Sequence, residues 1–169
     1  MSIATGMLLT SALLCTAWSA NAQTALSKSS KIKAAYIFNF TKYIEWPRAA
    51  FTHIETPITI CVEHNPEFND FIKALVKQRK VGKDQRSLIV RNINDANICH
   101  IAYVKSAEAH TETLLRNALV LSDMNNKHAF SAIIFFRQND KLRFEINMVE
   151  VNRLNITISS ELLKLARVK

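Results

Sequence analysis

Apolar and aromatic residues are densest between Lys31 and Pro47, where they leave few positions polar. Such a run is typical of a helix that is buried on most of its surface. Pro47 ends this predicted helix, because proline lacks the N–H that the next turn needs and disfavours helical geometry at Trp46. The first element of the folded domain is therefore predicted to be a largely buried helix.

Strand-like and helix-like patterns alternate after this helix. Helical spacing of apolar residues predicts helices at 65–78 and 106–118, and Asp123 starts a short helical turn that reaches Phe130. Val81-Gly82 marks a turn. Short apolar runs predict the intervening strands, at 58–62, 87–91, 98–104 and 119–122.

The order changes near the C-terminus. Two strands, at 132–137 and 142–147, flank a hairpin signal at residues 138–141. Asn147 caps a short helix over 148–154, and Ser159 or Ser160 caps the last one. The predicted fold is thus α/β, a single compact domain with a mixed β-sheet flanked by helices, ending in a β-hairpin and two short helices.

Residues 1–22 have the features of a signal peptide. Met7 to Trp18 is mostly apolar, and Ala20-Asn21-Ala22 fits the small-x-small cleavage rule, although no Lys or Arg precedes the apolar core. About a dozen apolar residues are too few to span a bilayer, which argues against a membrane anchor. Leu14 is larger than the residue that normally precedes a lipidated cysteine, which argues against lipidation of Cys15. The expected product is an exported domain over residues 23–169.

The charge of the chain is strongly basic, with a formal net charge of +8. Its excess is concentrated between Phe71 and Asn94, where Asp84 is the one acidic residue among seven basic ones: Lys73, Lys77, Arg79, Lys80, Lys83, Arg86 and Arg91. One interpretation is a solvated helix end and loop. The other is a docking patch for an acidic partner or an anionic ligand, with Lys77 and Lys80 as candidate contacts. Nucleic acid is not an expected partner, because the protein is exported and carries no recognition motif.

Two cysteines, Cys61 and Cys99, remain after cleavage of the signal peptide. An even count in an oxidising compartment favours a disulfide, which would stabilise the fold by roughly 4 kcal/mol on the loop-entropy estimate. A Cys2His2 metal site with His64 and His100 is an alternative, although adjacent strand residues such as Cys99 and His100 point to opposite faces. Free thiols are the third alternative.

Signatures of common enzymes are missing from the sequence. There is no phosphate-binding glycine loop, no G-x-S-x-G and no H-E-x-x-H, and the five histidines are scattered. An enzymatic activity and a cofactor are therefore not expected.

The segment RFEIN at 143–147 is an unusual polar cluster in an apolar region. Strand alternation places Arg143, Glu145 and Asn147 on one face and Phe144 and Ile146 on the other. One interpretation is an exposed face where Arg143 pairs with Glu145 and Asn147 caps the next helix. The other is a contact surface for a partner or ligand, because an arginine fixed beside a carboxylate can bind anions or peptides.

Several short blocks resemble one family in their order and spacing. They are AYIFNFTKYIEWP at 35–47, ITICV at 58–62, CHIAYV at 99–104, VLSD at 120–123, AIIFF at 132–136 and RFEINMVEVNRLNITISSELLKLA at 143–166. Together they resemble the YfiR/HmsC-like family of periplasmic regulators, over nearly the whole mature chain.

The resemblance implies a non-catalytic periplasmic protein with a compact α/β fold. Its best understood members bind the periplasmic sensor domain of an inner-membrane diguanylate cyclase and hold that enzyme inactive. An outer-membrane lipoprotein can sequester the regulator, which raises cyclic di-GMP and promotes biofilm formation. The resemblance also implies that Cys61 and Cys99 match cysteine positions of the family.

Two departures from the family pattern limit the comparison. Ser131-Ala132 stands where members often have two glycines, so a tight backbone approach is altered there. A second cysteine pair near the last hairpin, found in some members, is absent. The alternatives to a repressor are a small-molecule sensor that binds a periplasmic solute at the carboxyl ends of the strands and, less favoured, a hydrolytic enzyme. The sequence leaves the oligomeric state open, so a homodimer stays among the options.

Overall fold

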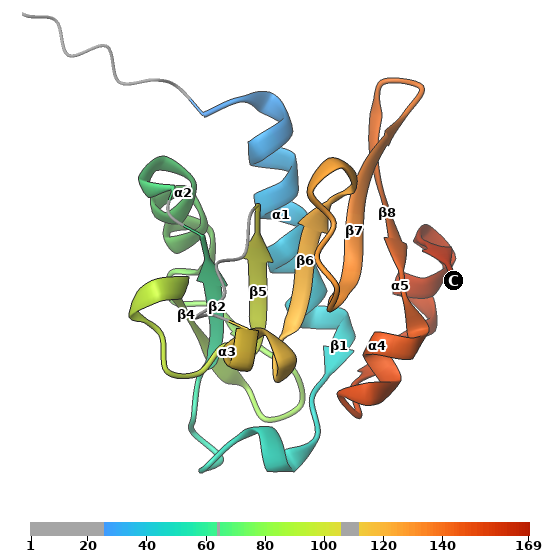
Figure 1. Cartoon of the computed structure of the whole chain (residues 1–169). Coiled ribbons are helices and arrows are strands. Elements are labelled where there is room, and N and C mark those ends of the chain that lie inside the picture. Colours follow the sequence, from blue (N-terminus) through green and yellow to red (C-terminus); the bar gives the residue numbers. More distant parts are fainter. Residues whose placement is uncertain (1–25, 64, 106–111) are drawn as a thin grey trace, which may run out of the picture.

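The computed structural model describes residues 26–63, 65–105 and 112–169. Its main feature is an eight-stranded sheet in the order β10-β8-β7-β6-β5-β2-β4-β3 (Figure 1). The strands are β2 (Ile58–Val62), β3 (Lys80–Val81), β4 (Arg86–Asn92), β5 (Ile101–Val104), β6 (Leu119–Asp123), β7 (Ser131–Gln138), β8 (Lys141–Ile146) and β10 (Arg167–Val168). A separate pair joins β1 (Ile44–Glu45) and β9 (Thr157–Ile158).

Within the described residues, five α-helices flank the sheet and three short 3-10 turns lie in the loops. The helices are α1 (Lys28–Tyr43), α2 (Pro66–Val76), α3 (Glu112–Arg116), α4 (Met148–Arg153) and α5 (Ser160–Leu165). The 3-10 turns are η1 (Arg48–Ala50), η2 (Ile93–Asp95) and η4 (Met124–Asn126). In Figure 1, α1 and α2 lie together behind the central strands and α3 lies on the near side. The predicted α/β class, mixed sheet and flanking helices are confirmed.

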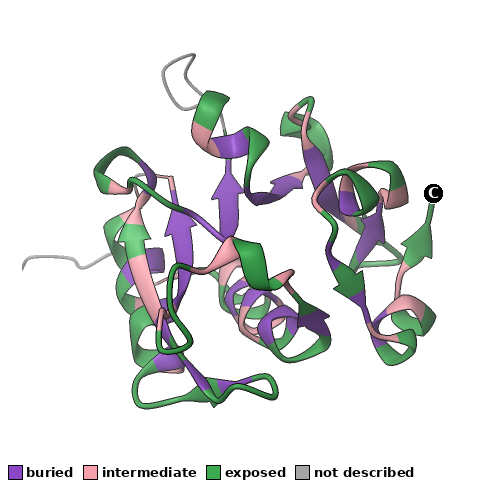
Figure 2. Ribbon diagram, turned by 90° about the horizontal axis from the view of Figure 1, so that it is seen from below, coloured by how far each residue is buried: buried purple, intermediate pink, exposed green. Residues whose placement is uncertain are grey.

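The sheet is parallel at its centre and antiparallel towards its edges. β4, β2, β5, β6 and β7 run parallel, β3 pairs antiparallel with β4, and β8 pairs antiparallel with β7 and parallel with β10. Strands that are buried on both faces have near-continuous apolar sequences. β2 and β5 accordingly have apolar sequences and are buried at every residue, so both are drawn as purple arrows in Figure 2.

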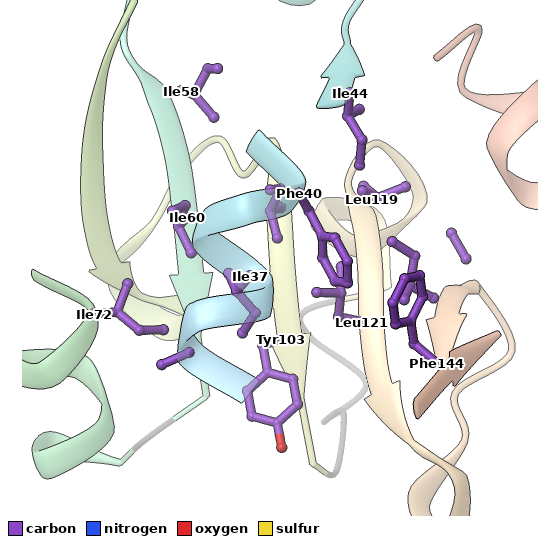
Figure 3. Close-up of a cluster of buried hydrophobic side chains, with 14 of the residues drawn as sticks. Ile37, Phe40, Ile44, Ile58, Ile60, Ile72, Tyr103, Leu119, Leu121 and Phe144 are labelled. Carbon is purple, nitrogen blue, oxygen red and sulfur yellow. The ribbon is translucent and has the colours of Figure 1, made fainter. Parts of the chain in front are cut away.

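Helix α1 supplies the centre of the larger core. Ile37 and Phe40 are fully buried and point towards the strands that carry Leu121 and Phe144 (Figure 3). The Phe40 ring packs edge-on against Phe144, with ring centroids 5.1 Å apart, and stacks on Phe135 at 6.1 Å. The aromatic run therefore supplies core packing from one side of α1, but the prediction that most of the helix surface is buried is wrong, because Ile32 and Tyr43 are exposed.

The C-terminal end of α1 differs from the prediction. The helix ends at Tyr43, and Ile44–Glu45 form β1 instead of continuing to Trp46. Ile44 pairs with Ile158, and Ser159 N–H donates to the Tyr43 carbonyl at 2.9 Å. These partners lie more than a hundred positions away in the sequence, so the local pattern alone did not indicate this strand.

The terminal elements match the predicted caps closely. Asn139 and Asp140 both have positive φ, as a two-residue hairpin turn between β7 and β8 requires. The Asn147 side chain accepts a hydrogen bond from Val149 N–H and caps α4, and Ser159 caps α5 by accepting from Leu162 N–H. The strands β1, β3, β9 and β10 were not predicted, since two residues carry too little pattern. The predicted helical turn after Asp123 is short and forms the 3-10 turn η4. The start of the helix predicted at 106–118, from Ser106 on, lies outside the described residues.

Ser131-Ala132 lies at an irregularity between β6 and β7, where the register shifts at Val120 and Leu121. Both residues are buried. The Ser131 hydroxyl lies 2.7 Å from that of Ser122 and accepts from His128 N–H at 2.9 Å. A serine hydroxyl thus links β6 and β7 at this irregularity.

Candidate partner-binding surfaces

Cys61 of β2 and Cys99, just before β5, form a disulfide with a Cα–Cα distance of 5.7 Å. Both residues are buried, in a small apolar cluster on the α3 side of the sheet that includes Ala102 and Leu115. The predicted disulfide is confirmed. The thiolates that a zinc site would need are bonded to each other, and His64 lies outside the described residues.

His100 takes part in a different arrangement on the other side of β5. Its Nδ1 accepts a hydrogen bond from Thr59 N–H at 3.0 Å, so the ring proton resides on Nε2 and is donated to the Ala50 carbonyl at 3.2 Å. The ring stacks on Phe51 with centroids 4.6 Å apart. Burial lowers the pKa of His100, the Ala50 contact opposes this shift, and the nearby Arg86 charge adds to it.

Arg86 is a buried structural residue and not part of the basic surface to which the sequence assigned it. It is 7% exposed, and its Nη1 lies 3.1, 2.6 and 2.9 Å from the carbonyls of His53, Ile54 and Thr56. Its guanidinium also covers Phe51 at 3.7 Å and pairs with Asp84 at 3.1 Å. This one side chain holds the loop between Trp46 and β2 against the sheet.

The RFEIN segment lies mostly on β8, the strand next to β10 at one edge of the sheet. Glu145 is only 2% exposed, so the interpretation of an exposed Arg143–Glu145 pair is wrong. The Glu145 carboxylate instead faces the neighbouring strand β10: Lys169 Nζ lies 3.1 Å from both of its oxygens and Arg167 Nη1 lies 3.8 Å from one. These ion pairs hold the C-terminal residues on β8, because a buried carboxylate needs a cation or hydrogen-bond donors.

The two other residues of this segment have separate surroundings. Asn147 is the N-cap of α4. Arg143 is exposed, opposite Phe136 of β7 in the strand register, and Arg167 covers the Phe136 ring at 4.2 Å. A partner at this edge would therefore meet Arg143 directly, whereas Glu145 and Asn147 maintain the local structure.

Lys77 and Lys80 lie at the opposite edge of the sheet. Lys77 follows α2 and Lys80 lies in β3, and both are exposed. Since β3 and β10 are the two ends of the strand order, the structure does not bring these lysines together with Arg143. The candidate contact residues thus form two separate surfaces, the β4 edge with Lys77 and Lys80, and the β8 edge with Arg143.

A polar cluster that the sequence did not indicate lies at the carboxyl ends of β5 and β6. Lys33 Nζ lies 2.6 and 2.7 Å from the two Asp123 carboxylate oxygens, and the Tyr103 hydroxyl donates to Asp123 at 3.0 Å. Burial, together with the Asp123 charge, raises the pKa of Tyr103 well above its usual range. The only sequence signal was a lysine within an aromatic helix, and its partner is 90 positions away.

The described part of the chain offers no group of three or more His, Cys, Asp or Glu side chains that could hold a metal ion. In the same residues, no helix is long and apolar enough to cross a membrane. The signal peptide predicted over 1–22 lies outside the described residues.

Comparison with known families decides the relationship of this chain. The sequence model of the YfiR/HmsC-like family matches residues 30–167. The chain belongs to the YfiR/HmsC-like family. A search of curated proteins finds no match. At the level of the family, membership supports a periplasmic, regulatory and non-catalytic protein that acts on a diguanylate cyclase, and the Cys61–Cys99 disulfide suits an oxidising compartment.

Proposed function

We propose that this protein binds the periplasmic sensor domain of an inner-membrane diguanylate cyclase and represses the enzyme, which lowers cyclic di-GMP and biofilm formation. The observation that carries the proposal is the family match over residues 30–167, which spans every strand of the main sheet except the last residue of β10. A regulator of this kind needs no catalytic group.

Repression follows from a population shift between two states of the cyclase. The regulator binds the inactive state of the sensor domain better than the active state, and only this difference in affinity changes the activity. A preference of about 100-fold corresponds to roughly 2.7 kcal/mol. An outer-membrane lipoprotein is the proposed second partner, which would release the cyclase by sequestering the regulator.

Two exposed surfaces can supply the contact with the sensor domain. The β4 edge offers Lys77 and Lys80, and the β8 edge offers Arg143. Charge reversal at one surface leaves the other intact, because β4 and β8 are each next to last at opposite ends of the strand order. The pair Lys77→Glu/Lys80→Glu and the single change Arg143→Glu therefore separate the two surfaces.

The test is capture of the protein's partner from cross-linked periplasm and membranes of its own host. The affinity tag belongs at the mature N-terminus, since Lys169 N–H donates to the Ile146 carbonyl and the Lys169 carbonyl accepts from Met148 N–H. Recovery of a diguanylate cyclase supports the proposal, and loss of capture with one charge-reversed variant assigns the surface. Recovery of no membrane protein contradicts it.

A specific observation favours one further function, that of a small-molecule sensor. A groove of about 430 Å³ lies beside the Lys33–Asp123 pair at the carboxyl ends of the strands, where open α/β sheets bind ligands. Phe136 and Arg137 are among its lining residues. A thermal-shift screen with periplasmic metabolites tests this function, and a hit whose stabilisation survives Arg137→Gln and Asn125→Ala would place the ligand elsewhere.

A further inference from the structure

The outer edge of β4 is open along most of its length. On this edge β3 covers only two residues of β4, because its Val81 pairs with Arg86 and its Lys80 with Ser87. The opposite edge of β4 is paired with β2 from Leu88 to Asn92. Within the described ranges, no strand pairs with Leu88–Arg91 on the β3 side. A strand edge of this kind presents unpaired N–H and C=O groups to an incoming chain.

A groove runs along this open edge. It has a volume of about 520 Å³ and lies between the last turns of α2 and β4. Its walls are Lys73, Ala74, Val76 and Lys77 from α2 and Leu88–Arg91 from β4. Val90 is half-buried on the α2 side, so the groove combines an apolar floor with backbone groups that no strand pairs.

The rim of the groove is positive. Lys77 and Arg91 are exposed, and in the described structure neither has an ion-pair or hydrogen-bond partner; Lys73 is exposed and pairs only with Asp70 of its own helix at 3.2 Å. Val90 packs against the α2-side core, so strand alternation turns Arg91 towards the opposite face. The cations therefore stand on both sides of the edge, with Lys77 on the helix side.

We propose that the groove between α2 and β4 binds an extended acidic segment of a partner protein as an added strand. The backbone of the segment would pair with β4 and continue the line of β3 along its open edge, and its carboxylates would meet Lys77 on one face and Arg91 on the other. A second copy of the chain fits poorly, because two such grooves would bring their cationic rims together. The site does not depend on the partner being a diguanylate cyclase.

The test uses the folded mature protein and a synthetic probe, the peptide acetyl-Val-Glu-Asp-Val-Thr-Glu-amide, whose adjacent Glu and Asp point to opposite faces of an extended chain. Amide NMR shifts during titration are expected at Leu88–Asn92 and Lys73–Lys77. Two N-methylated peptides, each methylated at alternate residues, provide the control. Binding is expected to be lost when the methyl groups lie on the edge that faces β4, because they block the backbone hydrogen bonds, and to persist when they lie on the other edge. A purely electrostatic contact would not distinguish the two peptides.

Matched charge variants complete the test. Lys77→Glu/Arg91→Glu is expected to weaken peptide binding by about tenfold. Lys127→Glu/Lys164→Glu changes the net charge by the same amount at exposed positions elsewhere and should leave binding unchanged.

Three results would overturn the inference. The first is no shift at millimolar peptide, and the second is shifts spread over all lysines with no effect of N-methylation. The third is a dimer in light scattering that Lys77→Glu/Arg91→Glu dissociates, which would make a second copy the occupant. Because the peptide titration needs no cyclase, its failure is distinct from failure of the proposed function.

Discussion

The two ends of the main sheet are both rich in cations, but their cations have different roles. At the β8 end, Lys169 and Arg167 neutralise the buried Glu145 and hold the last strand in place. At the β4 end, buried Arg86 holds the structure, and Lys77 and Arg91 remain open to solvent. Each end therefore has cations that are structural, Arg86 at one and Arg167 and Lys169 at the other, beside exposed cations that are candidates for binding.

The disulfide between β2 and the start of β5, in the same half of the sheet as β4, is expected to make the largest contribution to stability. Cys61→Ser/Cys99→Ser should lower the free energy of unfolding by about 4 kcal/mol, because the open chain gains loop entropy in the unfolded state. Urea denaturation of the oxidised protein and of the double variant measures the difference. A loss below about 1 kcal/mol would show that non-covalent contacts alone hold this half of the sheet.

Arg86 is expected to rank second. Arg86→Met leaves the carbonyls of His53, Ile54 and Thr56 without their buried cationic donor and should cost about 3 kcal/mol. The matched control is the exposed Arg79, where the same substitution should change stability by less than about 0.5 kcal/mol. Equal effects at the two positions would contradict a structural role for Arg86.

Glu145 provides the corresponding test at the β8 end. Glu145→Gln removes the buried charge from Lys169 and Arg167, which are both about half exposed, and should cost about 2 kcal/mol. Glu55→Gln, at an exposed position, is the control. Amide hydrogen exchange should become faster at Val168 and Lys169 in the Glu145 variant. Unchanged exchange there would contradict a role of the Glu145 ion pairs in keeping β10 paired with β8.

Acidification should destabilise the β4 end through His100. Its pKa is lowered in the folded protein, so below the ordinary value of 6.5 the unfolded chain binds more protons than the folded one. Stability therefore decreases as the pH falls below about 6.5, by at most about 1.4 kcal/mol per pH unit. Denaturation curves between neutral and mildly acidic pH measure this slope, which should be smaller in His100→Gln.

The smallest effect on stability is expected at the open surface of the β4 end. Lys77→Glu/Lys80→Glu should change the free energy of unfolding by no more than about 0.5 kcal/mol, because neither lysine side chain has an ion-pair or hydrogen-bond partner in the described structure. Partner capture should nevertheless fall. Unfolding by denaturant and capture by the tagged variant, measured side by side, distinguish a binding surface from a solvated one, for which capture would be unchanged.

Local patterns in the sequence were sufficient for most of the fold. Buried strands such as Ile58–Val62, the Asn139-Asp140 turn and the Asn147 and Ser159 caps depend on neighbouring residues only. The two-residue strands could not be predicted, because their pairing depends on partners far along the chain.

The same limit applies to charged side chains. The sequence pattern predicted surface positions for Arg86 and Glu145. Nothing local to either residue indicates that a backbone loop will cover Arg86 or that a C-terminal strand will cover Glu145. The disulfide was predictable because the compartment and the cysteine count both indicated it. The separation of Lys77 and Lys80 from Arg143 became evident only from the strand order.

The most direct test of the regulatory role is the synthesis of cyclic di-GMP by membranes that contain the captured cyclase, with the mature protein added on the periplasmic side. Synthesis is expected to fall as the protein is added, and to recover when the protein is replaced by Lys77→Glu/Lys80→Glu or Arg143→Glu, whichever variant loses capture. Synthesis that stays constant at saturating protein would contradict the claim that this protein is a repressor.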